Sequence, residues 1–281
     1  MNIIVFSSGS EGNCTLVKTE DSNILIDAGI SFRQIKLNLE NSGVDINDVD
    51  GLLITHEHID HIKGLAMLLK VEGLNIYLTR GTFNAIYSIY KSSGKDKQCE
   101  LLEARYKTGK IHLIDRIKDS ILYPEINVNN TLIDVLPTFH DAAESIGFVI
   151  HEGEKKLVYI TDTGYVHQSL YPFINNADIY VMESNHDPEI LMHSSRPYPL
   201  KIRILSDHGH MSNEDSMVTL ANVIGPRTKL IMHAHISSEC NLSRIIELTR
   251  EKVFKDYGLA TDNIKFICLA PRPSGEFSVW K

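Results

Sequence analysis

The run Thr55-His56-Glu57-His58-Ile59-Asp60-His61 directly follows a short apolar segment that has the character of a buried strand. Its three imidazoles and its aspartate are good ligands for zinc, manganese or iron. A loop at a strand end directs alternate side chains to one point, so we expect His56 and His58 on one face. Asp60 and His61 then turn toward a neighbouring position, which predicts two metals rather than one. The zincin motif H-E-x-x-H is excluded, because Asp60 stands where its second histidine would be.

Three more ligand-type residues stand just after other predicted strands. They are His140, Asp162 and His235. Each alone is explained equally well as a turn or capping residue. Together with the histidine run they form a set large enough for a pair of metal ions.

The apolar patterning predicts many short strands followed by helices in each half of the chain. Strands are expected at residues 2–6, 14–18, 23–27, 51–55, 75–79, 131–136, 146–151, 156–161, 179–183, 229–232 and 264–269. Helices are expected at residues 32–41, 62–72, 82–90, 188–193, 198–206, 213–223 and 242–257. This order favours two sheets packed face to face with helices outside. We expect a single domain over residues 1–281, with a peripheral, strand-rich insertion at 99–130.

Composition narrows the class of protein. The formal net charge of −8 argues weakly against a general nucleic-acid coat protein, although bound cations would add positive charge locally. The four cysteines form no C-x-x-C pair, which argues against a thiolate zinc site. Neither a signal peptide nor an apolar run of about 20 residues is present, so we expect a cytoplasmic protein without a membrane partner. The oligomeric state stays open.

The H-x-H-x-D-H pattern from His56 to His61 resembles the signature of the metallo-β-lactamase superfamily. The resemblance covers nearly the whole chain, because Asp27, His140, Asp162 and His235 follow in the expected order. Five blocks resemble the YycJ/WalJ branch: Ser7-Ser8-Gly9-Ser10-Glu11-Gly12-Asn13-Cys14, Thr55-His56-Glu57-His58, Glu183-Ser184-Asn185-His186-Asp187, Gly209-His210-Met211-Ser212-Asn213 and Ala234-His235-Ile236-Ser237. The chain departs from the branch at Met211, at Cys240 and in the region 99–130.

The resemblance implies an αββα sandwich of two mixed sheets flanked by helices, which agrees with the patterning. It also implies two divalent metal ions (Zn, Mn or Fe), one held by His56, His58 and His140, the other by Asp60, His61 and His235, with Asp162 bridging. A water between two such cations becomes hydroxide near neutral pH and can act as the nucleophile. The family places an aspartate such as Asp27 behind a ligand histidine, where it fixes the tautomer; a turn aspartate is the alternative.

The remaining candidate residues concern proton transfer and substrate. Asp60, His186 and His210 are the expected catalytic residues, although either histidine could instead cap a helix or satisfy a buried backbone group. Substrate contacts are expected from Ser10, Asn13, Asn185 and Asn213. Phosphate contacts are also open to Arg196, Lys201 and Arg203, for which a solvated helix face is the favoured interpretation.

The resemblance implies a metal-dependent hydrolase of phosphodiesters, with DNA as the substrate and exonuclease cleavage as the reaction. One alternative is a phosphodiesterase of cyclic or other small nucleotides, which a closed pocket would favour over a wide basic groove. The other is a metal-binding regulatory protein without activity, which the complete ligand set argues against. The native metal and the polarity of cleavage are not determined by the sequence.

Overall fold

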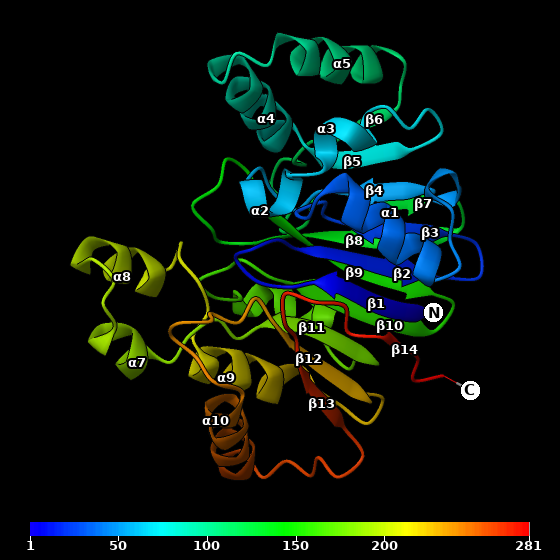
Figure 1. The fold of residues 1–281 in the computed structure, drawn as a ribbon. Coiled ribbons are helices and arrows are strands. Elements are labelled where there is room, and N and C mark those ends of the chain that lie inside the picture. Colours follow the sequence, from blue (N-terminus) through cyan, green and yellow to red (C-terminus); the bar gives the residue numbers. More distant parts are fainter. Residues whose placement is uncertain (281) are drawn as a thin grey trace.

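The computed structural model describes residues 1–280 as two seven-stranded sheets packed face to face, with helices on their outer sides (Figure 1). The first sheet has the order β14 (Glu276–Phe277), β1 (Asn2–Ser7), β2 (Cys14–Lys18), β3 (Asn23–Ile26), β4 (Gly51–Leu53), β5 (Asn75–Thr79) and β6 (Ile111–Ile114). The second has the order β13 (Lys265–Cys268), β12 (Leu230–Ala234), β11 (Ile179–Glu183), β10 (Lys155–Ile160), β9 (Ile146–Glu152), β8 (Thr131–Pro137) and β7 (Ile126–Val128). The expected sandwich of two mixed sheets is confirmed.

Helices cover both outer faces. Those packed on the first sheet, or linked to it, are α1 (Phe32–Asn41), α2 (Ile59–Ile62), α3 (Leu65–Leu68), α4 (Arg80–Ser92) and α5 (Asp96–Lys107), with a short 3-10 turn at Ile46–Asp48. The second sheet carries α6 (Tyr171–Ile174), α9 (Asn213–Val223) and α10 (Ser243–Asp256), with a 3-10 turn at Gln168–Leu170. The helices α7 (Pro188–His193) and α8 (Tyr198–Leu205) form an arm that projects from the body (Figure 1).

Strand alternation explains why the layers pack as they do. In β1, Ile3 and Val5 point into the core between the two sheets, whereas Ile4 and Phe6 point into the core under the helices of the first sheet. Successive side chains of a strand face opposite sides, so a strand that is apolar throughout must be covered on both faces. The sequence of β1 therefore requires a layer on each side of its sheet.

Parallel pairing brings the important strand ends to one edge. β3 and β4 run parallel in the first sheet, and β10, β11 and β12 run parallel in the second. Their carboxyl ends lead into the loops that hold the ligand-type residues. In sheets of this kind the carboxyl ends of parallel strands are the usual place for a ligand.

Two expectations for the secondary structure are wrong. The region 99–130 is not a strand-rich insertion, because it contains most of α5 and then supplies β6 and β7, the outermost strands of the two sheets. The helix expected at 62–72 is reduced to the four-residue α3, because α2 ends at Ile62 and Gly64 separates the two. The Gly64 N–H donates to the carbonyl of Ala28 (2.7 Å), and a Cβ there would lie 2.7 Å from the carbonyl oxygen of Ile30.

Across residues 1–280, every helix is too short or too polar to cross a membrane.

Candidate metal centre

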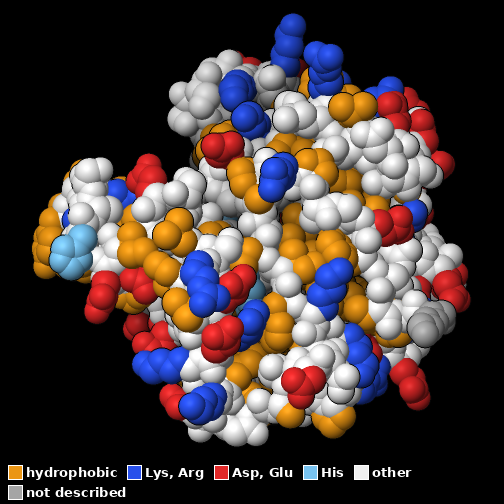
Figure 2. All heavy atoms as spheres, turned by 60° about the horizontal axis from the view of Figure 1, so that its bottom comes forward, with side chains coloured by type: hydrophobic (Ala, Val, Ile, Leu, Met, Phe, Trp, Pro, Cys, Tyr) orange, Lys and Arg blue, Asp and Glu red, His pale blue; other side chains and the backbone are white. Residues whose placement is uncertain are grey.

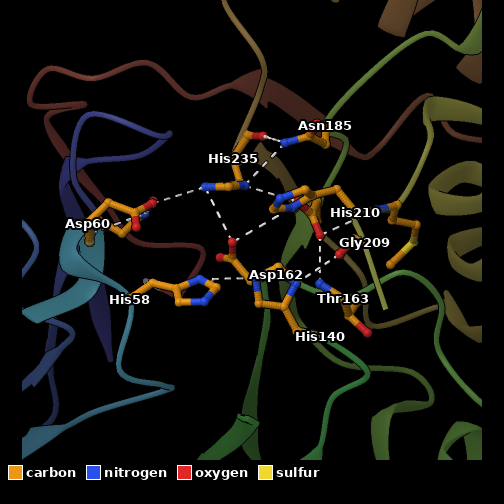
Figure 3. Close-up of polar contacts among 12 residues, drawn as sticks. His58, Asp60, His140, Asp162, Thr163, Asn185, Gly209, His210 and His235 are labelled. Atoms are coloured by element: carbon orange, nitrogen blue, oxygen red, sulfur yellow. Dashed lines mark hydrogen bonds and ion pairs between the residues drawn. The ribbon is translucent and has the colours of Figure 1, made fainter. Parts of the chain in front are cut away.

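The first group of ligand atoms joins the histidine run to β8. The ligand atoms of His56, His58 and His140 all lie within 4.8 Å of one another. His58 Nδ1 is 3.3 Å from His140 Nε2, and Figure 3 marks this contact with a dashed line. His56 lies three residues after Leu53, the last residue of β4, and His140 lies three residues after Pro137, the last residue of β8. Two segments more than eighty residues apart in the chain thus form one three-histidine cluster.

The second group joins the same run to β12. The ligand atoms of Asp60, His61 and His235 also lie within 4.8 Å of one another. Asp60 Oδ2 is 3.6 Å from His61 Nε2 and 3.6 Å from His235 Nε2. The run is therefore divided as expected, with its first two histidines in one cluster and its last two ligand-type residues in the other.

Asp162 lies between the two groups. It follows β10, and its Oδ2 is 3.3 Å from His61 Nε2 while its Oδ1 is 3.4 Å from His235 Nε2. It also forms a ligand-type group with His56 and His61. Figure 3 shows its carboxylate pointing at the ring of His235 and lying above His58 and His140. One carboxylate is thus placed to bridge both clusters.

Unpartnered buried atoms test whether the site fits metal ions. Within residues 1–280, the buried side-chain atoms that have no hydrogen-bond partner include His56 Nε2, Asp162 Oδ2 and His235 Nε2. Each such atom costs about 1–3 kcal/mol when it is left unsatisfied. All three belong to the clusters above, and imidazole nitrogens with carboxylate oxygens suit zinc, manganese and iron. The residues present therefore fit divalent cations.

Asp27 supports the second cluster from behind. Its Oδ2 is 2.7 Å from His61 Nδ1, and its Oδ1 accepts hydrogen bonds from the Thr55 N–H (2.8 Å) and the Thr55 hydroxyl (3.0 Å). The three side chains are buried. A carboxylate that accepts from Nδ1 leaves Nε2 free to face a metal. Asp27 therefore lies where its carboxylate can fix the tautomer of His61.

The local backbone is unusual at the site. Asp27, Asp162 and His235 have φ angles of 61°, 55° and 50°, and they are three of the six non-glycine residues with positive φ within residues 1–280. Such conformations cost of order 1 kcal/mol or more and concentrate at functional sites. Position 29 requires glycine, because a Cβ there would lie 1.6 Å from the Asp60 carbonyl oxygen. The loop after β3 therefore packs directly against the backbone of Asp60.

Charge in the cluster is balanced between carboxylates and histidines. Burial lowers the pKa of His61, but Asp27 and Asp162 oppose it and hold that pKa well above its ordinary value. Burial likewise lowers the pKa of His235, yet Asp162, Asp60 and Glu183 raise it to about 10. Burial favours neutral Asp162, but His235 and His61 hold its pKa well below the usual range. In the metal-free protein, the surrounding carboxylates thus favour the protonated forms of His61 and His235.

Glu183 is a central residue that was not singled out from the sequence. It ends β11, its side chain is 0% exposed, and its Oε1 is 2.8 Å from His210 Nδ1 and 3.0 Å from His235 Nδ1. Its Oε2 accepts a hydrogen bond from the Thr163 N–H (2.8 Å). Burial opposes ionisation, but His210 and His235 lower the pKa of Glu183 to about 2. A charged residue ending an otherwise apolar strand was the available signal.

The two expected proton donors differ in access. His210 is partly exposed and held by Glu183 at its Nδ1. His186 is 1% exposed, neither ring nitrogen has a partner among the described residues, and burial lowers its pKa to about 4. It is therefore neutral and shielded from substrate at neutral pH. The structure removes His186 as a candidate acid and retains His210.

The four residues expected to contact the substrate also differ in their access to the site. Ser10 and Asn185 line a cavity beside His210. The Asn13 amide nitrogen is 3.0 Å from His61 Nε2 and 3.4 Å from Asp60 Oδ2, so it adjoins the second cluster. Asn213 is a wrong expectation, because it is 1% exposed and its amide exchanges two hydrogen bonds of 2.9 Å with Asn241.

Of the three cationic residues considered as phosphate contacts, one does not face the site. Lys201 is buried, and its ammonium group donates to the carbonyls of Met192 (2.8 Å) and Ser194 (2.7 Å). It therefore holds the end of α7 instead of facing a substrate. Arg196 and Arg203 do line the cavity beside His210.

Comparison with known proteins identifies the family. The model of the "Beta-lactamase superfamily domain" matches residues 22–234. Exodeoxyribonuclease YycJ of Bacillus anthracis is 34% identical over 258 residues, covering 92% of this chain and 90% of that protein. Exodeoxyribonuclease WalJ of Streptococcus pneumoniae is 34% identical over 261 residues, with coverages of 92% and 90%.

A solved structure agrees in fold. The human short form of tRNase Z has a TM-score of 0.65 and 16% identity, with all of both chains covered. At this identity the likeness concerns the fold alone. The domain match and the two relatives in turn support an enzyme of the metal-dependent hydrolase class. The chain belongs to the family of the beta-lactamase superfamily domain.

Proposed function

We propose that this chain is a dinuclear metal-dependent exonuclease of DNA. The observation that carries the proposal is the pair of three-residue clusters with Asp162 between them, because ligand atoms in this set are buried and have no hydrogen-bond partner. In this assignment His56, His58 and His140 hold one divalent ion, Asp60, His61 and His235 hold the other, and Asp162 bridges both. Two ions placed in this way would supply an activated water and would stabilise charge on the phosphoryl oxygens.

The surrounding residues would orient this site. Asp27 would keep the proton of His61 on Nδ1, so that Nε2 faces the cluster. Glu183 would do the same for His235 and would also orient His210. His210 would carry a proton to the oxygen of the leaving group, because it is partly exposed and its Nδ1 is held by a buried carboxylate.

The shape around the site favours an extended substrate. The cavity that His210 lines also contains Arg196 and Arg203, and a larger hollow of about 370 Å³ is lined by His140, Arg116 and Phe139. The rings of His140 and His210 are 4.9 Å apart, so the two hollows meet at the metal ligands. A strand of nucleic acid can lie in both hollows at once, whereas a cyclic nucleotide would fill only one.

DNA as the polymer is inferred from the relatives. Both carry the name exodeoxyribonuclease and align with 92% of this chain. Figure 2 shows cationic and acidic side chains intermixed on the face in view, with no continuous basic stripe. Because the chain also has a formal net charge of −8, recognition would depend on the metal site and its adjoining arginines more than on general positive charge.

A substrate panel tests this function. Metal-loaded protein is incubated with end-labelled double- and single-stranded DNA, RNA, cyclic nucleotides and bis-p-nitrophenyl phosphate. We expect shortening of labelled DNA from an end. Rapid turnover of cyclic nucleotides without DNA cleavage would replace the nuclease by the small-molecule alternative, and preferential cleavage of RNA would replace DNA as the substrate.

A further inference from the structure

A small cavity adjoins the second ligand cluster on the side of the α7–α8 arm. It has a volume of about 100 Å³. Ser10, Asn185, Ser237 and His210 contribute polar groups to its wall, and Arg196 and Arg203 contribute two cations. Asn185 donates to the His235 carbonyl (2.7 Å), so the cavity shares a wall with a ligand residue. Figure 3 shows Asn185 and His210 on the side of His235 opposite Asp60.

Both arginines keep most of their donors available. Arg196 donates from Nε to Glu239 (2.9 Å), and Arg203 donates from Nε to Asp141. A guanidinium group has five N–H donors in a planar fork. Among the described residues, the terminal nitrogens of these two arginines have no recorded hydrogen bond. Four N–H groups on each side chain are thus free to bind an anion.

The two ion pairs also fix the arm relative to the centre. Asp141 follows the ligand His140, and Glu239 belongs to the loop that begins at the ligand His235. Arg196 lies in the link between α7 and α8, and Arg203 lies within α8. Each arginine therefore connects the arm to a loop that carries a ligand. An anion held by both arginines would be positioned with respect to the metal centre.

Size and charge identify the anion. The cavity volume of about 100 Å³ is sufficient for a phosphate group. Of the charged lining residues, two are cationic and Asp141 is anionic. A phosphate monoester carries about −1.5 to −2 charges at neutral pH, whereas a diester within a strand carries one. A terminal monoester has three unesterified oxygens, whereas a diester has two. It can therefore accept more hydrogen bonds from two guanidinium groups than a diester can.

We propose that this cavity binds the terminal phosphate of the DNA strand that is being cut. The inference rests on the proposed nuclease function and extends it, since a site for a strand end makes the enzyme act from ends. It assigns to Arg196 and Arg203 the role of binding that phosphate, with Ser10 and Ser237 as further donors.

The test compares duplexes that differ only at their ends. Each strand end carries either a phosphate or a hydroxyl group, at the 5′ or at the 3′ terminus, and cleavage rates are measured for the metal-loaded protein. We expect a phosphate at one of the two termini to make cleavage about tenfold faster. A hydrogen bond to a charged group contributes a free energy that corresponds to about a tenfold change. In Arg196→Ala and Arg203→Ala the ratio of the two rates falls to about one.

Lys255→Ala is the matched control. Lys255 is an exposed cation in the last turn of α10, at the opposite end of the second sheet from His235, and its removal leaves the ratio unchanged. Equal cleavage of all duplexes by the unmodified protein would overturn the proposal. A preference that persists in both arginine variants would overturn it equally. Inhibition by inorganic phosphate without any preference for a phosphorylated end would show a site for free phosphate instead.

Binding separates this proposal from the nuclease proposal. Anisotropy is measured on duplexes whose terminal linkages are phosphorothioates, which resist cutting. Tighter binding of the phosphorylated end, lost in the arginine variants, supports the terminal-phosphate site even if DNA is never cleaved. Equal binding of both ends refutes the site even if DNA is cleaved.

Discussion

Asp27 Oδ2 lies 2.7 Å from His61 Nδ1, and both side chains are completely buried. We expect Asp27→Asn to weaken metal binding about 10- to 100-fold, because the aspartate that fixes the tautomer of His61 is lost. Metal affinity is measured by competition with a chelator. Asp134→Asn is the control, since Asp134 makes a similar pair with His151 (2.9 Å) away from the centre. Equal affinity in Asp27→Asn and the unmodified protein would contradict this role.

Metal binding should release protons. The carboxylates around them raise the pKa of His61 and raise that of His235 to about 10 in the metal-free protein, so His235 carries a proton at neutral pH. A ligand histidine must be neutral, and therefore metal binding releases at least the proton of His235 and becomes tighter as the pH rises. Calorimetry in buffers of different ionisation enthalpy measures the number. Release of no protons at pH 7 would contradict the protonated state of His235.

The same shift predicts how stability depends on pH without metal. The folded-state pKa of His235, about 10, lies above the ordinary value of 6.5. The protonated form is favoured in the folded state, so its contribution to stability is complete below pH 6.5 and is lost as the pH rises toward 10. The Tm of protein kept metal-free by a chelator should therefore fall as the pH rises over this range. A constant or rising Tm over the same range would contradict the shift.

His210 is expected to donate the proton to the leaving oxygen. His210→Gln should reduce DNA cleavage by about 100-fold or more, because an alkoxide leaving group needs a proton. Cleavage of bis-p-nitrophenyl phosphate should fall far less, since p-nitrophenolate leaves without one. His167→Gln, at an exposed 3-10 turn, serves as the control. Equal losses on the two substrates would assign His210 a positioning role instead.

Asn213 should affect stability and not substrate binding. Asn213→Ala removes the two hydrogen bonds that Asn213 exchanges with the buried amide of Asn241, at a cost of about 1–3 kcal/mol in the free energy of unfolding, although Asn241 still donates to the Ser184 carbonyl. Denaturant unfolding measures the loss. The KM for DNA should stay unchanged, and a raised KM with normal stability would restore Asn213 as a substrate contact.

The ligand-type residues were predictable because strand ends and histidine spacing are local features of the sequence. Residues 32–41 were also predicted correctly as a helix from the spacing of Ile35 and Leu39, which share its buried face, and the structure adds a capping box formed by Ser31 and Gln34. Glu183 was missed because its importance comes from two histidines that follow it by 27 and 52 residues. Such contacts depend on how the strands are ordered, which local patterning does not reveal.

The positions that misled the sequence analysis share another cause. Asn213 and His186 stand within motif blocks beside the site, yet both side chains are 1% exposed. Spacing along the chain places a residue near the site but does not say which way its side chain turns. The positive φ angles of Asp27, Asp162 and His235 were equally invisible, because aspartate and histidine adopt them only where the surrounding loops impose them.

The central claim is that two metal ions, bridged by Asp162, hydrolyse DNA. It is tested most directly by adding manganese or zinc stepwise to metal-free protein while the rate of DNA cleavage is measured. We predict that the rate keeps rising beyond the first equivalent and reaches its plateau at about two equivalents per chain. A plateau at one equivalent, or no DNA cleavage at any metal content, would contradict the account.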